Sequence, residues 1–151
     1  ADSISLRELA EQAGVSPRAP YVHFPAKRDL LIAVADHGFQ ELTRLSDQAG
    51  HDLFALGEVY VSFALENPHL FRLMFGGTAT PEECPDSGRS FQHVLTAIRH
   101  HHPHLTEEEV HQGGIELWAF VHGLADLRIQ GLVREAELRT LALRFAAIAR
   151  F

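Results

Sequence analysis

Histidine and glutamate residues crowd one stretch of the chain, and these side chains have the most varied chemistry. The stretch contains His100, His101, His102, His104 and His111, together with Glu107 and Glu108. Imidazole and carboxylate groups are zinc ligands. Consecutive residues of a helix, however, point about 100° apart, and Pro103 separates His104 from the histidines before it. We therefore expect a solvated helix end that titrates near neutral pH, with no metal and no cofactor.

Other arrangements that support catalysis are missing from the sequence. We find no paired nucleophile and base, no phosphate loop, and no unbroken His-x-x-x-His helix with a nearby glutamate. Such patterns are what nucleophilic, phosphate-binding and metal-dependent enzymes require. The sequence therefore argues against an enzyme, including a histidine-rich metallohydrolase on a helical scaffold.

Cysteine content and hydropathy indicate a compartment. Cys84 is the only cysteine, so no intrachain disulfide can form, and a reducing environment is expected. No uncharged apolar run reaches the about 18 residues that a membrane span needs, and no signal-peptide pattern opens the chain. We expect a cytoplasmic protein without a membrane partner.

The charge is unevenly distributed along the chain. The formal net charge is -7, but residues 1–28 carry four basic against three acidic residues, and the remainder carries nine basic against 17 acidic. Polyphosphates are bound largely through Lys and Arg. A nucleic-acid contact would therefore have to lie near the N-terminus.

Apolar residues recur at helical spacing along almost the whole chain, which predicts an all-α fold. Glycine and proline residues separate the periodic segments. The expected helices cover residues 4–13, a short segment from 17, 26–46, 53–66, 69–75, 88–101, 107–130 and 135–151. We divide the chain into residues 1–46, a DNA-binding helix-turn-helix with a connecting helix, and residues 47–151, a helical bundle for ligand binding and dimerisation.

The first two helices are expected to form the helix-turn-helix. Ser3 or Ser5 would cap the first helix, and Gly14 would supply its left-handed C-cap residue. Ser16 would then cap a second helix with Pro17 at its first position. In such a motif the start of the second helix meets base edges, while flanking groups contact phosphates.

Seven residues of this region are candidates for DNA contacts. They are Ser5, Ser16, Arg18, Ala19, Tyr21, His23 and Lys27. Arg18 is the only long donor at the exposed start of the second helix, so it could read a base or touch only phosphate. Ala19 could contact a thymine methyl. Lys27 would begin the next helix, where a phosphate also meets free N–H groups. Tyr21 could instead pack between the helices.

Residues Leu6 to Leu31 resemble the helix-turn-helix of the tetracycline-repressor (TetR) family. The resemblance rests on the Ala13-Gly14-Val15-Ser16 turn, Tyr21-x-His23-Phe24, and Lys27 followed by Leu30-Leu31. Further on, Phe63 to Phe75 and Trp118-x-x-x-His122-Gly123 are similar to the C-terminal domain of one group in this family. The resemblance covers nearly the whole chain.

The resemblance implies a homodimeric repressor that leaves its double-stranded operator DNA when a small, largely apolar effector binds. It also implies phosphate contacts at Tyr21, His23 and Lys27. An amphipathic helix precedes the helix-turn-helix in this family, so we expect residues before Ala1 or a copy impaired in DNA binding. Residues 48–51 are also short for the usual connection between the fourth and fifth helices of the family, so we expect further residues near Gly50 as well. A DNA-independent helical sensor or interaction module with a vestigial helix-turn-helix is the alternative.

The last two expected helices are apolar on more than one face, which predicts a second partner. The candidate residues of a dimer interface are Val121, Leu124, Leu141, Phe145 and Ile148. Two-fold pairing through these helices resembles the family arrangement. A central helix pair within a monomer is the alternative.

A ligand pocket is expected among aromatic residues that the dimer does not need. The candidates are Phe63, Phe71, Met74, Phe75, Phe91, Trp118 and His122. They combine a soft apolar lining with few polar groups, as small-molecule sites do. Ordinary core packing is the alternative for each of them, and His122 in particular could be a satisfied buried histidine.

Overall fold

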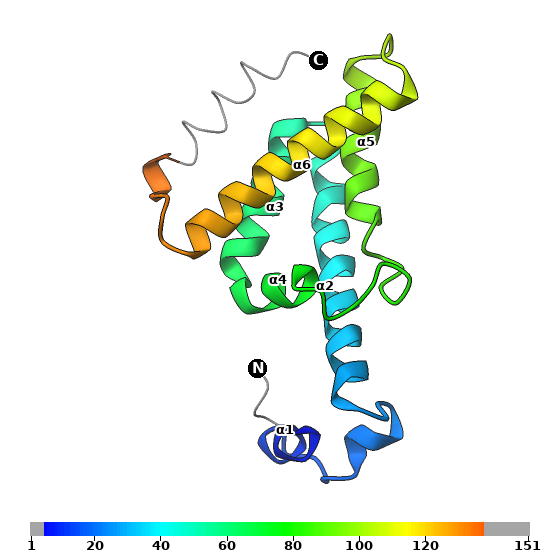
Figure 1. Cartoon of the computed structure of the whole chain (residues 1–151), viewed down its shortest axis with the longest axis vertical. Helices are drawn as coiled ribbons and strands as arrows, with labels where there is room; N and C mark the ends of the chain where they lie inside the picture. The colour runs from blue at the N-terminus through cyan, green and yellow to red at the C-terminus, as the bar shows by residue number, and fades with distance from the viewer. Residues whose placement is uncertain (1–4, 138–151) are drawn as a thin grey trace.

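The computed structural model describes residues 5–137 and shows an all-α molecule (Figure 1). The elements are α1 (Leu6–Gln12), the 3₁₀ helix η1 (Ala19–Val22), α2 (Lys27–Ala49), α3 (Leu53–Glu66), α4 (Pro68–Phe75), α5 (Arg89–His101) and α6 (Glu107–Ile129). The expected boundaries agree within a few residues, except for the second helix. Most of the expected last helix lies outside the described residues. None of the helices in the described part of the chain is long and apolar enough to cross a membrane.

Side-chain caps determine where several helices begin. The Ser5 hydroxyl accepts the Glu8 N–H at 3.2 Å, and the Glu8 carboxylate accepts the Ser5 N–H at 2.6 Å. Thr106 and Glu109 repeat this capping box at the start of α6, and Asp52 caps α3. These caps satisfy N–H groups that have no partner inside the helix.

The turn after α1 follows the prediction, but the helix after it does not. Gly14 has a φ of 70°, the left-handed conformation expected of a C-cap glycine. The short helix expected to begin at Pro17 after a Ser16 cap instead begins at Ala19, and it is a 3₁₀ helix. Pro20 has no N–H to donate to the Ser16 carbonyl, and Ala19 donates to that carbonyl instead at 2.9 Å. The segment therefore closes as a 3₁₀ helix.

α2 joins an N-terminal head to a helical bundle (Figure 1). The head, residues 5–26, lies at the start of α2, and α3 to α6 pack around the remainder. The main core contains Ala35, Phe39, Leu42, Tyr60, Phe63, Ala64, Phe71, Met74, Cys84 and Ala125. A smaller core of Leu95, Ile98 and Val110 joins α5 to α6. The head is thus carried on a helix whose other end belongs to the core.

α2 and α4 approach each other closely at one glycine. A Cβ atom on Gly38 would lie 2.6 Å from the Met74 sulfur, which is too near for van der Waals contact. Any side chain at this position would displace Met74, so the absence of a Cβ lets Met74 fill the space between the two helices.

Candidate functional site

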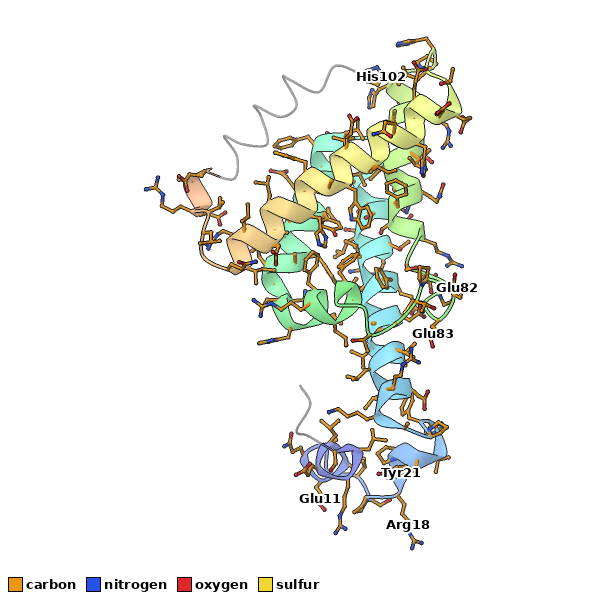
Figure 2. The ribbon with its side chains drawn as sticks, in the orientation of Figure 1. Glu11, Arg18, Tyr21, Glu82, Glu83 and His102 are labelled. Carbon is orange, nitrogen blue, oxygen red and sulfur yellow. The ribbon has the colours of Figure 1, made fainter. Side chains whose placement is uncertain are left out.

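The head presents polar side chains at the end of the molecule remote from the bundle. Ser5, Ser16, Arg18, Tyr21 and His23 are exposed, and Ala19 and Lys27 are partly buried. Arg18 lies at the tip and extends away from the bundle (Figure 2). Tyr21 is 52% exposed, so the structure does not support the alternative in which it packs between the helices. The tip is therefore free to meet a large partner.

Two residues of the head differ from the sequence-based assignment. The Ser5 hydroxyl donates to the Glu8 carboxylate at 2.8 Å while it accepts the Glu8 N–H, so a phosphate would have to compete with the capping box. Val22, which the sequence analysis did not select, is 77% exposed beside Tyr21. Exposed apolar side chains suit thymine methyl groups. The motif gave no signal for this residue, because Val22 occupies the unspecified position of Tyr21-x-His23.

A cavity of about 440 Å³ lies among α2 to α6 and the segment between α4 and α5, residues 76–88. We call this segment the pocket loop. Four of the seven predicted lining residues, Met74, Phe75, Phe91 and Trp118, line the cavity. Among its described lining residues none carries a charged side chain. The cavity therefore suits a neutral molecule better than an ion.

The other three predicted residues, Phe63, Phe71 and His122, do not line the cavity. Phe63 and Phe71 are 2% and 3% exposed and belong to the main core. Tyr60 lines the cavity and packs edge-on against Phe71, with ring centroids 5.7 Å apart. His122 is hydrogen-bonded to the same tyrosine. These residues support the cavity wall from behind, because Tyr60 occupies the position nearer the cavity.

One whole wall of the cavity, formed by α3, was not predicted from the sequence. Leu53, Leu56, Gly57 and Tyr60 line the cavity from α3, and their spacing of three and four residues places them on one helix face. That periodicity was visible in the sequence. The pocket loop supplies a second wall through Gly77, Ala79, Thr80, Pro81, Cys84, Ser87 and Gly88. No periodicity marks a loop, so its role depends on the tertiary structure.

Trp118, Tyr60 and His122 form a chain of hydrogen bonds at the cavity wall. The Trp118 indole N–H donates to the Tyr60 hydroxyl at 3.1 Å, and this hydroxyl lies 2.8 Å from His122 Nδ1. Burial raises the pKa of Tyr60 and lowers the pKa of His122, so both are neutral at pH 7. If His122 Nδ1 carried the proton, the Tyr60 hydrogen would have no acceptor among the described contacts. The tautomer with its proton on Nε2 gives the Tyr60 hydrogen an acceptor, and on this ground we assign that hydrogen to the bond with His122 Nδ1.

The pocket loop is tied to the first turn of α2 by an ion pair. Both Glu83 carboxylate oxygens accept from the Arg28 guanidinium, at 2.7 Å and 2.8 Å. Figure 2 shows Glu83 on the loop beside α2. The Arg28 guanidinium, helped by the Thr80 N–H, lowers the pKa of Glu83 to about 2. The pair joins a cavity wall to the residue that follows Lys27.

Two further contacts fasten the pocket loop along α2. The Cys84 thiol donates to the Ile32 carbonyl at 3.8 Å, and the Asp86 N–H donates to the Asp36 carboxylate at 3.3 Å. Ile32 and Asp36 follow Arg28 at intervals of four residues, so the contacts lie on one side of α2. The loop therefore runs alongside the helix that carries the head.

α6 exposes an apolar stripe on its outer side. Ile115, Ala119, Gly123 and Leu127 recur every four residues, and Ile115 and Leu127 are 40% and 39% exposed. A Cβ atom on Gly123 would meet no other atom within 4 Å. Exposed apolar surface of this kind is typical of helix contacts with a partner.

The predicted interface residues fall elsewhere on this helix or outside the described part of the chain. Val121 lines the cavity, and Leu124 is only 7% exposed, so both face the interior of the subunit. Leu141, Phe145 and Ile148 lie outside the described residues. Because α6 is apolar on more than one face, its composition alone did not show which face is buried.

The histidine-rich segment lies at the end of α5, remote from the head and from the pocket loop (Figure 2). The His51 and His100 rings stack with centroids 4.7 Å apart, and His101 Nε2 lies 2.8 Å from the His51 carbonyl oxygen. Within residues 5–137, no three His, Cys, Asp or Glu side chains come together as metal ligands would.

Comparisons with known proteins agree with this architecture. The profile described as "Bacterial regulatory proteins, tetR family" matches residues 1–34, and the profile described as "Tetracyclin repressor-like, C-terminal domain" matches residues 53–149. A solved structure of a protein of unknown function from Rhodococcus sp. RHA1 is 27% identical to this chain. Its TM-score is 0.80, and the match covers 99% of this chain and 84% of that one.

A second solved structure, of a candidate regulatory protein named SCO4313, is 19% identical with a TM-score of 0.72. The match covers 96% of this chain and 82% of that chain. At this level of identity the likeness shows the fold.

Proposed function

The chain belongs to the tetracycline-repressor family of DNA-binding transcriptional regulators, whose members are not enzymes, and from this premise we propose that it is an effector-released repressor. The proposed active form is a cytoplasmic homodimer that binds double-stranded operator DNA. A small, largely apolar molecule bound in the cavity lowers the DNA affinity. Residues 1–46 carry the DNA contacts, and residues 47–151 carry the effector and dimer contacts.

The observation that carries the proposal is the position of Arg18. It projects from the exposed tip of a helix-turn-helix, away from the bundle (Figure 2). Arginine donates two parallel hydrogen bonds to guanine in the major groove. Tyr21 and His23 are exposed on the same element and can reach phosphates or sugars.

The position of the pocket loop supports a link between effector and DNA. A ligand in the cavity touches the loop, and the loop holds Arg28 in the first turn of α2. An effector can weaken DNA binding only if it prefers one of two conformations, and a coupling of about 1–3 kcal/mol is sufficient. Displacement of the loop would reorient the start of α2 and therefore the head.

The outer stripe of α6 supports the homodimer. Two copies of α6 can approach closely where Ala119 and Gly123 provide no bulky side chain. A two-fold pair would present two heads to successive turns of the major groove. The stripe replaces Val121 and Leu124 as the proposed α6 contribution, and Leu141, Phe145 and Ile148 stay proposed for the last helix.

A binding experiment tests the central claim. The protein is titrated by fluorescence anisotropy into labelled duplexes from the DNA upstream of its own coding region and into a scrambled duplex of equal length, at matched salt. We expect clearly tighter binding to one upstream duplex. Equal affinity for upstream and scrambled DNA would support the DNA-independent sensor instead.

A cavity-filling variant tests the effector claim. Met74→Trp should occupy space that a ligand needs, because Met74 lines the cavity. In a thermal-shift screen of small neutral molecules, ligands should raise the melting temperature of the wild type and leave that of Met74→Trp unchanged. Hits that stabilise the wild type should also release it from the upstream duplex. Release that persists in Met74→Trp would place the effector site elsewhere.

A further inference from the structure

The buried polar side chains that line the cavity share one property, which is that their hydrogens are already donated to protein atoms. The Ser46 hydroxyl donates to the Leu42 carbonyl at 2.8 Å, and the Cys84 thiol donates to the Ile32 carbonyl. Ser46 and Cys84 are 4% and 1% exposed. Neither group has a hydrogen left for a ligand.

The Tyr60 hydroxyl, which lies in the middle of the chain of hydrogen bonds between Trp118 and His122, has the same property. Its hydrogen goes to His122, and the Trp118 N–H that could otherwise serve a ligand points at the Tyr60 oxygen. A hydroxyl oxygen has two acceptor positions, and Trp118 occupies one of them. Tyr60 and Trp118 both line the cavity, whereas His122 does not. The free acceptor position of Tyr60 therefore lies at the cavity wall.

We propose that the cavity selects neutral effectors that carry a hydrogen-bond donor, a hydroxyl or N–H group on an apolar skeleton, and that the Tyr60 oxygen is the acceptor. This inference rests on the proposed role of the cavity as the effector site. It goes further, because it states which polar group the effector carries and which residue recognises it.

The same arrangement disfavours two other classes of ligand. A molecule that offers only acceptors, such as an ether or ester, would bury them opposite lone pairs and lose its hydrogen bonds to water. A carboxylate would bind more weakly still, because no Lys, Arg or other cation is among the described residues that line the cavity. The other hydroxyl groups of the described lining belong to Thr80, Ser87 and Ser90. These residues are less buried than Tyr60, so an acceptor bound to them would still compete with water.

Three probes of similar shape test the selection. Isothermal titration calorimetry at neutral pH compares 4-propylphenol, which has a donor, with 4-propylanisole, which has only an acceptor, and with 4-propylbenzoate, which is an anion. We expect the wild type to bind the phenol about fivefold more tightly than the anisole, the effect of one neutral hydrogen bond. The benzoate should bind most weakly.

Variants locate the effect. In Tyr60→Phe the acceptor is lost and the Trp118 N–H becomes available, so the preference for the phenol should vanish or reverse. In Trp118→Phe both acceptor positions of Tyr60 are open, so the preference should persist. Phe91→Leu is the matched control, because Phe91 lines the cavity with no polar atom and should weaken both neutral probes by a similar factor.

Each result decides between stated alternatives. If the wild type binds the anisole as tightly as the phenol, donor selection is overturned and the cavity can still be the effector site. If the preference survives in Tyr60→Phe, the assignment to Tyr60 is overturned. If none of the probes binds, both this inference and the effector role of the cavity are overturned, while DNA binding by the head is unaffected. The wild-type comparison and Trp118→Phe decide the matter even if Tyr60→Phe does not fold.

Discussion

At the scale of single residues, Arg18 and Lys27 occupy different places relative to a duplex. Arg18 extends from the tip of the head, whereas Lys27 begins α2 and is partly buried. A side chain that reads bases contributes to sequence preference, and one that contacts phosphate contributes equally on all sequences. Removing the Arg18 side chain and removing the Lys27 side chain should therefore weaken DNA binding in different ways.

We predict that Arg18→Ala costs about 1–3 kcal/mol on the operator and relaxes sequence preference. Lys27→Ala should weaken binding uniformly and lower the salt dependence by about one ion. Anisotropy titrations on operator and scrambled duplexes at several salt concentrations measure both effects. Equal losses on the two duplexes for Arg18→Ala would show that Arg18 contacts only phosphate.

His122 is predicted to respond to pH in a defined direction. Burial lowers its pKa below the ordinary value of 6.5, so the unfolded chain binds the proton more readily than the folded chain. The contribution of His122 to stability is therefore present above about pH 6.5 and is lost as the pH falls through the folded pKa. Protonation would also remove the acceptor for the Tyr60 O–H.

Two measurements check this prediction. The imidazole signal of His122, assigned by its absence in His122→Phe, should titrate by NMR with a midpoint below 6.5. Between about pH 7 and 5 the wild type should lose more thermal stability than His122→Phe, which lacks the titrating group. A midpoint at or above the ordinary value would contradict the proposed hydrogen-bond direction.

At the scale of elements, the pocket loop and α2 should act together. The Arg28–Glu83 pair is partly exposed, with side chains 53% and 34% accessible, so its contribution to stability should be small. Its geometry, however, joins the cavity wall to the first turn of α2. We predict that Glu83→Gln leaves the melting temperature nearly unchanged but alters the effector concentration needed for DNA release by several-fold.

Glu82→Gln provides a matched control for this prediction. Glu82 is the neighbouring glutamate, is also exposed, and is involved with Thr80 and not with Arg28. Glu82→Gln removes the same charge from the same loop as Glu83→Gln does. Because it leaves the Arg28–Glu83 ion pair intact, it should not alter effector-dependent release of DNA. Identical shifts for the two variants would indicate a general charge effect, and the ion pair would then have no special role in coupling.

At the scale of the whole molecule, the apolar stripe on α6 is predicted to hold two subunits together. Ala119→Glu would place an unpaired charge where two copies of α6 meet, and a buried unpaired charge is strongly unfavourable. Sedimentation velocity should show the wild type as a dimer and Ala119→Glu as a folded monomer. Gln48→Glu, on the exposed surface of α2, is the matched control and should stay dimeric. A wild type that sediments as a monomer at all concentrations would remove the dimer from the proposal.

The sequence by itself determined the features that depend on neighbours a few residues away. Gly14 was predicted as a C-cap residue, and Ser5 was one of two candidate N-caps, because a cap and its target lie within one turn. The Thr106–Glu109 pair carries the same kind of local signal, although it was not used. The same local patterns carried the family resemblance. The short helix expected after Ser16 differs from the prediction for a local reason as well, because Pro20 removes one hydrogen-bond donor.

The tertiary structure alone decided which apolar side chains surround the cavity and which polar groups meet there. Phe71 and Phe75 are equally apolar, yet only Phe75 lines the cavity, because Tyr60 from another helix lies in front of Phe71. The partners Arg28 and Glu83 are 55 residues apart, and Tyr60 and His122 are 62 apart. Composition and periodicity describe one helix at a time, whereas depth and pairing depend on how the helices pack together.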